Sequence, residues 1–150
     1  MIARRKLTQY ILDALEATTH PIGLAVNPPG SGWRGQPSSS GSTFVPYGVL
    51  VPGPASISEG PIVEPQVDWR LMYVVTSYSV DPRACEWMAD VFREAMVGLI
   101  KDTVTLETDY RIQQVRVSAL GAVTRYELTE PPYFGQTDSF DVWLSRVSLT

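Results

Sequence analysis

The fold is decided by residues 69–80, which read Trp69-Arg70-Leu71-Met72-Tyr73-Val74-Val75-Thr76-Ser77-Tyr78-Ser79-Val80. β-Branched and aromatic residues dominate this run, and both types are enriched in strands because they pack well on a pleated surface. We therefore predict a long β-strand here, the best-defined strand in the chain.

A helix is predicted directly after this strand. Asp81 supplies a side-chain acceptor at the N-cap position, and Pro82 suits the first helical turn, where a missing N–H is harmless. Apolar residues then recur with the 3.6-residue helical period, which predicts that they share the face that packs on the core. These residues are Ala84, Trp87, Met88, Val91, Phe92, Ala95, Met96 and Leu99.

The N-terminal segment predicts a second amphipathic helix, ended by Pro21. Its first turn carries the basic run Arg4-Arg5-Lys6. The helix macrodipole disfavours positive charge at this end. The run is therefore either a solvated start or a contact for an acidic partner. The apolar stripe of this helix consists of Leu7, Tyr10, Ile11, Ala14 and Leu15.

Three further strands are predicted around these elements. Residues 44–51 form one, with Pro46 favouring a sheet edge. Residues 111–120 form another, with either a bulge or a late strand start near Gln113, because the apolar positions change parity there. Residues 140–147 alternate as a closing strand, preceded by a turn at 130–135.

Two long loops complete the layout, at residues 27–43 and 52–66, both rich in Gly, Pro and Ser. The resulting order is α-β-β-α-β-β, with the loops flanking the first strand. We predict a single α+β domain spanning residues 1–150, with a mixed, mostly antiparallel sheet of about four strands packed with two helices.

Composition limits the possible functions. The net charge of −4 does not favour non-specific nucleic-acid binding, and Cys85 is the sole cysteine, which excludes an intramolecular disulfide. We expect no signal peptide and no apolar run of the ~20 residues that a membrane span needs. These features predict a soluble protein folded in a reducing cytosol.

The residue types that carry chemistry are sparse. His20 is the only histidine and is interpreted as a surface residue of a turn, while Cys85 is interpreted as a half-buried structural thiol. Residues 30–35 match G-x-G-x-x-G, but their Pro- and Ser-rich flanks lack the strand and helix that dinucleotide binding requires. We predict no catalytic residues, no metal site, no cofactor and no enzymatic activity.

Aromatic residues in the predicted loops and turns suggest protein contacts, because Trp and Tyr are enriched at binding hot spots. Trp33 either contacts a partner or folds back onto the core, and Tyr47 is interpreted as a core cap. The candidate contact residues are Trp33, Arg34, Phe44, Tyr133 and Phe134.

The chain resembles the tail-terminator proteins of long-tailed bacteriophages, particularly those infecting actinobacteria. The likeness rests on the opening segment 4–15, the Gly/Trp/Pro-rich loop leading into residues 44–50, and the long second helix followed by two strands. It covers nearly the whole chain.

The resemblance implies a virion protein made in the host cytoplasm. Its subunits would form a hexameric ring that caps the tail tube, stops tube polymerisation and meets a head-side connector protein, while genomic DNA passes through the lumen. Lumen-facing acidic residues would be Glu59, Glu64 and Asp68, for which a solvated loop is the alternative. The alternative functions are another phage neck protein, such as a connector or head-completion subunit, and a small enzyme with an inter-subunit site.

Overall fold

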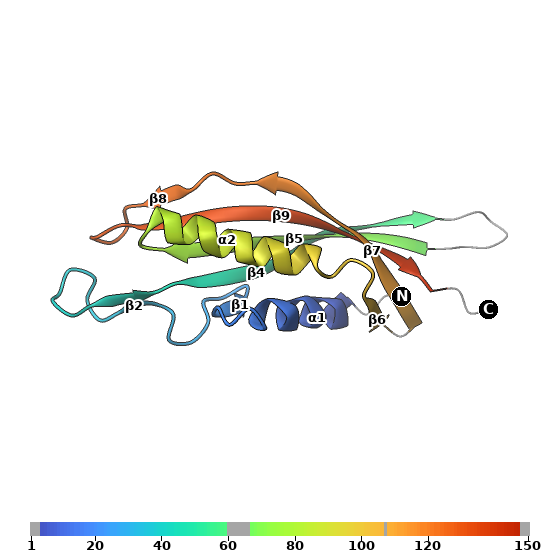
Figure 1. The fold of residues 1–150 in the computed structure, drawn as a ribbon, viewed down its shortest axis with the longest axis horizontal. Helices are drawn as coiled ribbons and strands as arrows, with labels where there is room; N and C mark the ends of the chain where they lie inside the picture. Colours follow the sequence, from blue (N-terminus) through green and yellow to red (C-terminus); the bar gives the residue numbers. More distant parts are fainter. Residues whose placement is uncertain (1–3, 60–66, 107, 148–150) are drawn as a thin grey trace.

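Two helices lie on one face of a long, twisted β-sheet (Figure 1). The structure is a computed structural model that describes residues 4–59, 67–106 and 108–147. Within those ranges, the elements are α1 (Arg4–Glu16), β1 (Ile22–Leu24), β2 (Gly32–Arg34), β3 (Thr43–Val45), β4 (Tyr47–Glu59), β5 (Val67–Ser79), α2 (Pro82–Val97), β6 (Thr103–Leu106), β7 (Thr108–Leu120), β8 (Thr124–Tyr126) and β9 (Tyr133–Arg146).

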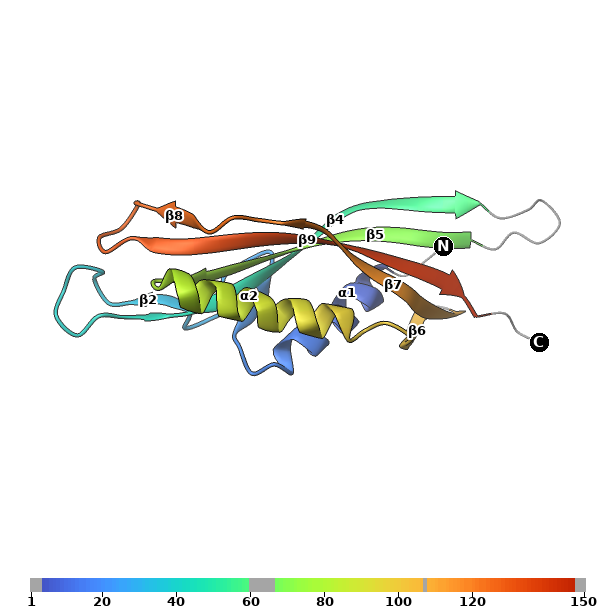
Figure 2. The same cartoon turned by 45° about the horizontal axis from the view of Figure 1, so that its top comes forward.

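The main sheet has the strand order β1-β4-β5-β9-β7-β6, and β8 also pairs with β9. Its pairs are antiparallel except for the parallel pair of β1 and β4. The strands β2 and β3 form a separate antiparallel hairpin. The sheet twists along its length, so that β4 and β5 diverge from β6 and β7 at one end (Figure 2).

The prediction of an α+β domain with about four strands is wrong. The described part of the protein is mostly β, with a seven-stranded sheet, a two-stranded sheet and only two helices. The strands β1, β6 and β8 have three or four residues each. Such short segments carry too little periodicity to be recognised, and their pairing with distant strands determines their conformation.

The loop predicted at residues 52–66 is incorrect for residues 52–59, because β4 continues to Glu59, and its remaining residues 60–66 lie outside the described residues. On the side of β4 that faces β1, the N–H of Gly48 donates to the carbonyl of Pro21, and the C=O of Leu50 accepts from the N–H of Ala25. The N–H and C=O groups of these alternate residues therefore point away from β5. Pro52 is the next residue of β4 whose backbone points away from β5, and it lies beyond Leu50, where the pairing with β1 ends. Its missing N–H therefore costs no ladder hydrogen bond, as expected for proline on an edge strand.

The loop predicted at 27–43 contains β2 and the first residue of β3, and the turn predicted at 130–135 contains the start of β9. By contrast, the bulge predicted near Gln113 is confirmed, since the register of β7 on β9 shifts between Ile112 and Gln114. The N-cap prediction is also confirmed, because the side chain of Asp81 accepts from the N–H of Arg83.

Both helices cover the same face of the sheet, which we call the helix-covered face. Tyr73 of β5 points to this face, and its hydroxyl lies 3.0 Å from the Thr8 hydroxyl of α1. Gly48 of β4 allows the Phe92 ring of α2 to approach, because a Cβ at that position would lie 2.6 Å from the ring. The largest fully buried side chains include Tyr73, Phe92, Phe140, Leu7, Ile11, Leu15, Leu50, Leu71, Met88 and Met96.

One apolar residue of the predicted α2 stripe does not face the core. Trp87 is 58% exposed, whereas Cys85 and Ala89 are buried. The exposed indole instead meets the ring of His20 edge-to-face, with ring centroids 5.0 Å apart. The stripe is therefore rotated relative to the prediction, and Trp87 lies at its margin.

The opposite face of the sheet, which we call the open face, carries neither helix (Figure 2). Side chains alternate along each strand, so the partners Tyr47 and Tyr78 share this face, while Gly48 and Ser77 point to the helices. The open face is therefore the broad surface on which partners of the protein are to be sought.

Candidate functional site

Six aromatic rings, one from each of six strands, gather at one end of the open face. We call them the aromatic cluster, and they connect two distant parts of the chain. Tyr47 stacks on Tyr78 with a 4.9 Å centroid separation, and Tyr126 stacks on Tyr133 at 5.1 Å. Phe44 joins the two halves, since its centroid lies 6.0 Å from those of both Tyr47 and Tyr133. The cluster consists of Trp33, Phe44, Tyr47, Tyr78, Tyr126 and Tyr133.

Gly135 makes the stacking of these rings possible. A Cβ built on Gly135 would lie 2.8 Å from the ring of Tyr126 and 3.0 Å from that of Tyr78. Because Gly135 has no side chain, the rings of Tyr126 and Tyr78 can pack directly against the backbone of β9. Such offset aromatic pairs contribute about 0.5–1.5 kcal/mol each beyond the area they bury.

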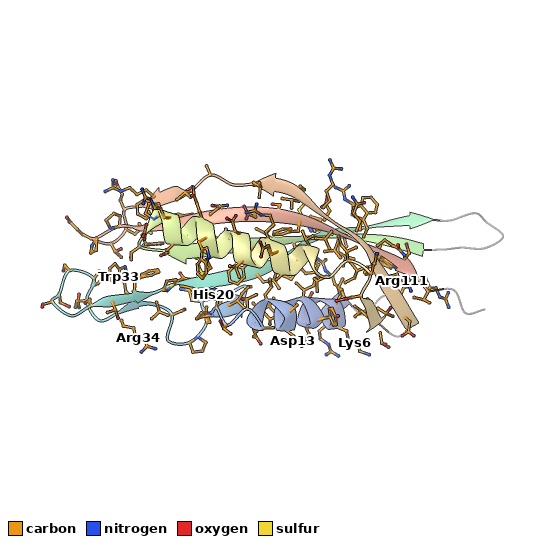
Figure 3. All side chains as sticks on the ribbon, in the orientation of Figure 1. Lys6, Asp13, His20, Trp33, Arg34 and Arg111 are labelled. Atoms are coloured by element: carbon orange, nitrogen blue, oxygen red, sulfur yellow. The ribbon has the colours of Figure 1, made fainter. Side chains whose placement is uncertain are left out.

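The β2–β3 hairpin adds the outermost ring of the cluster. Trp33 meets Phe44 edge-to-face at 5.4 Å, and its indole N–H donates to the Thr129 hydroxyl at 3.1 Å. Trp33 therefore folds back against the protein while keeping part of its surface exposed. Arg34 is exposed, and its Nε donates to the carbonyl of Gly30 (Figure 3).

The structure separates the candidate contact residues into two groups. Trp33, Phe44 and Tyr133 belong to the aromatic cluster. Phe134 does not, because it pairs with Ser79 in the register and points to the helix-covered face. Pattern reading missed Tyr78 and Tyr126, whose ring-to-ring contacts depend on strand register. Tyr47 was interpreted as a core cap, and it is only 6% exposed.

Two of the candidate acidic residues, Glu59 and Asp68, belong to β4 and β5, whose paired ends project beyond the helices (Figure 1). Glu59 ends β4 opposite Val67, and Asp68 pairs with Ser58 in the register. Glu64 lies outside the described residues. Whether these residues face a lumen therefore stays a prediction.

A buried ion pair lies further along the open face. Asp141 of β9 is 1% exposed, and its carboxylate accepts from the Arg70 guanidinium at 2.6 Å. The same guanidinium lies 5.3 Å from the centroid of the Trp143 ring. Arg70 therefore neutralises the buried carboxylate and covers the indole, which fixes side chains of two neighbouring strands on the open face.

Cys85 and His20, both interpreted from the sequence as structural residues, pack against other parts of the protein. Burial raises the pKa of the Cys85 thiol to about 11, so the thiol is neutral at physiological pH. Cys85 is fully buried, more deeply than predicted, and its Sγ donates to the Ser77 carbonyl at 3.2 Å. His20 packs against Trp87 and Phe92. Residues 30–35 contain β2, and the next element is β3, not a helix that could receive a pyrophosphate.

The described residues contain no group of three or more His, Cys, Asp or Glu side chains that could hold a metal ion. Neither α1 nor α2 is long and apolar enough to cross a membrane.

Alkaline pH is expected to destabilise the protein through two buried acids. Burial raises the pKa of Tyr47 to about 12, with smaller contributions from Tyr78 and Tyr133, and that of Cys85 to about 11. Both groups are neutral in the folded state, so their stabilisation is complete below their ordinary pKa values of 10.0 and 9.0. Stability should then fall by about 1.4 kcal/mol per pH unit for each group, until the folded pKa is passed.

Urea unfolding of the wild type, Tyr47→Phe and Cys85→Ala measures this effect. Cys85→Ala should flatten the pH dependence between about pH 9 and 11, and Tyr47→Phe that between about pH 10 and 12. The same slope in all three proteins would show that other groups cause the alkaline loss.

Known proteins resemble this chain in fold only. No family model matches the sequence, and no curated protein matches it either. Among solved structures, a chain in the virion of a native gene transfer agent particle has a similar fold. The TM-score is 0.51 at 10% sequence identity, and the match covers 95% of this chain and 97% of that chain. The two chains therefore share one fold from end to end.

Proposed function

We propose that this protein is a virion structural protein, and that its subunits form a ring that caps the phage tail tube. The observation that carries the proposal is the likeness to a chain of a gene transfer agent virion, which extends over almost the full length of both chains. The resemblance of the sequence to tail terminators points to the same kind of particle. In this role, the ring would stop polymerisation of the tail tube and would join the tube to a head-side connector protein.

The open face supports a role in assembly. It exposes a broad sheet surface that carries the aromatic cluster, and interface cores are enriched in aromatic residues. Apart from the open face, Leu120 at the end of β7 and Leu128 after β8 are 57% and 84% exposed; Leu120 pairs with Asp138 and so points to the helix-covered side. Contact with neighbouring subunits or with the tail tube protein would remove this apolar surface from water at about 25 cal/mol per Å².

Ring closure requires two different surfaces on each subunit. A contact between unlike patches repeats around an axis and closes when the rotation completes a circle. We propose six subunits, with DNA passing through the lumen without specific binding. The net charge of −4 supports this passage, because it does not favour adhesion to the phosphate backbone.

The mass of the assembled particle tests the proposal. The protein, alone or after addition of purified tail tube protein, should form a hexameric ring in native mass spectrometry and negative-stain images. A twelvefold ring would support a portal-side connector instead. A monomer with measurable turnover on small substrates would contradict both assembly roles.

A further inference from the structure

The N-terminal end of α1 borders a cavity with a basic side. This cavity of about 410 Å³ lies between α1 and the edge formed by β1 and β4. We call it the α1 groove. Its apolar part comes from Leu24 and Pro52 and its charged part from Arg4 and Arg5. The lining residues are Arg4, Arg5, Thr8, Gln9, Leu24 and Pro52.

Arg4 is built into the wall of this groove. Its guanidinium donates to the Gly53 carbonyl and lies 5.9 Å from the centroid of the Tyr73 ring. The Nε of Arg4 is buried and has no hydrogen-bond partner among the described residues. A carboxylate that entered the groove would provide the missing acceptor.

Arg5 and Lys6 add two exposed cations at the same helix end (Figure 3 labels Lys6). Neither forms an ion pair with a carboxylate in the described part of the chain. Three cations at a helix N-terminus oppose the macrodipole. This arrangement suits a surface that receives an acidic partner.

The same chain carries a segment with the complementary charge. Residues 35–69 contain no Lys or Arg and three carboxylates, at Glu59, Glu64 and Asp68. Glu59 and Asp68 lie in the paired part of the β4–β5 hairpin.

A subunit cannot fill its own groove with this hairpin. Pro52 and Gly53, at the groove, belong to β4 itself, and from Ala55 to Glu59 the strand runs on in continuous register with β5. At about 3.3 Å per residue, the paired hairpin moves steadily away from the groove. It passes beyond the end of α1 that bears Lys6 (Figures 1 and 3). The acidic segment is thus available to another molecule.

We propose that the α1 groove of one subunit receives the acidic β4–β5 hairpin of a second copy of this chain. Groove and hairpin are different surfaces, and each copy offers one of each, as a heterologous contact requires. This inference rests on the proposed ring and names the contact that closes it. Opposite charges at this contact would also steer subunits into register.

Charge reversal tests the contact. Arg5→Glu with Lys6→Glu should lower the assembled fraction at least tenfold in sedimentation velocity, and Glu59→Lys with Asp68→Lys should do the same. Arg4 is kept because it binds Gly53. Combining all four substitutions should restore assembly. Arg83→Glu with Arg125→Glu is the matched control, since both residues are exposed and lie at the start of α2 and in β8, at the opposite end of the molecule from the groove, and it should assemble normally. Assembly of every variant at the wild-type level would overturn the inference and leave the ring itself intact.

Disulfide trapping tests the same contact independently of ring size. A Gln9→Cys protein mixed with a Ser58→Cys protein should form a mixed disulfide dimer under mild oxidation. The native Cys85 does not compete, because it is fully buried. Gln9→Cys mixed with Ser38→Cys is the control and should remain unlinked. No mixed dimer in the first pair, or equal yields in both, would refute the contact. Failure of the proposed capping function would appear instead as a wrong ring mass with the mixed disulfide still formed.

Discussion

Replacement of Gly48 by valine is expected to lower the free energy of unfolding by about 3 kcal/mol, at the upper end of overpacking costs. A Cβ at this position would lie 2.6 Å and 2.9 Å from two ring carbons of Phe92. That ring is 1% exposed and is held between α2 and the sheet. Relief of the clash must therefore move the helix away from β4.

A second substitution identifies the ring as the cause. Phe92→Leu alone should cost roughly 1 kcal/mol because the side chain is smaller. The Gly48→Val, Phe92→Leu double variant should lose less stability than the sum of the two single losses. Urea denaturation of the four proteins gives the coupling directly. Strict additivity would mean that the clash is not with Phe92.

Arg70→Ala is expected to cost about 2 kcal/mol, because it leaves the buried carboxylate of Asp141 without its ion-pair partner. Breaking a fully buried pair costs about 3–5 kcal/mol, and the value is lower here because the Arg70 side chain is 45% exposed. The double variant Arg70→Ala, Asp141→Asn should be more stable than Arg70→Ala alone, because it no longer buries an unpaired carboxylate.

Arg116→Ala provides the matched control. Arg116 is the register partner of Asp141 on β7 but is exposed, and among the described residues it forms no ion pair. Its loss should change stability by less than about 0.5 kcal/mol, as for ordinary surface positions. Equal losses in Arg70→Ala and Arg116→Ala would show that both guanidinium groups share the carboxylate in solution.

The sequence predicted those elements that local chemistry determines. Asp81 and Pro82 mark the start of α2 unambiguously, and the β-branched run at 69–80 corresponds to β5. The change of parity near Gln113 even located a bulge. Each of these features is encoded within a few neighbouring residues.

The missed strands depend on distant partners. Pro52 and Pro54 made the second half of β4 look like a loop, yet a long strand pairs there because β5 supplies the other side of the ladder. Trp87 was wrongly predicted to face the core. The periodicity of apolar residues on a helix does not show which edge of the apolar face packs against the sheet and which stays exposed to solvent. Residue type alone could not exclude an exposed tryptophan whose ring meets that of His20 edge-to-face.

The candidate contact residues show the same division. Trp33 and Tyr133 were noticed as aromatics in a predicted loop and a predicted turn, and Phe44 as the first residue of a predicted strand. The structure brings the three together. Tyr78 appeared to be an ordinary strand residue until the register placed it beside Tyr47. The separation of Phe134 from its neighbour Tyr133 follows from strand alternation, which is readable only when the strand start is known.

Tail length in particles assembled without this protein tests the capping function most directly. Tube polymerisation would then lack its terminator, so electron micrographs should show tails of variable and excessive length, and added wild-type protein should restore a uniform length. Tails of normal, uniform length in its absence would contradict the proposed function.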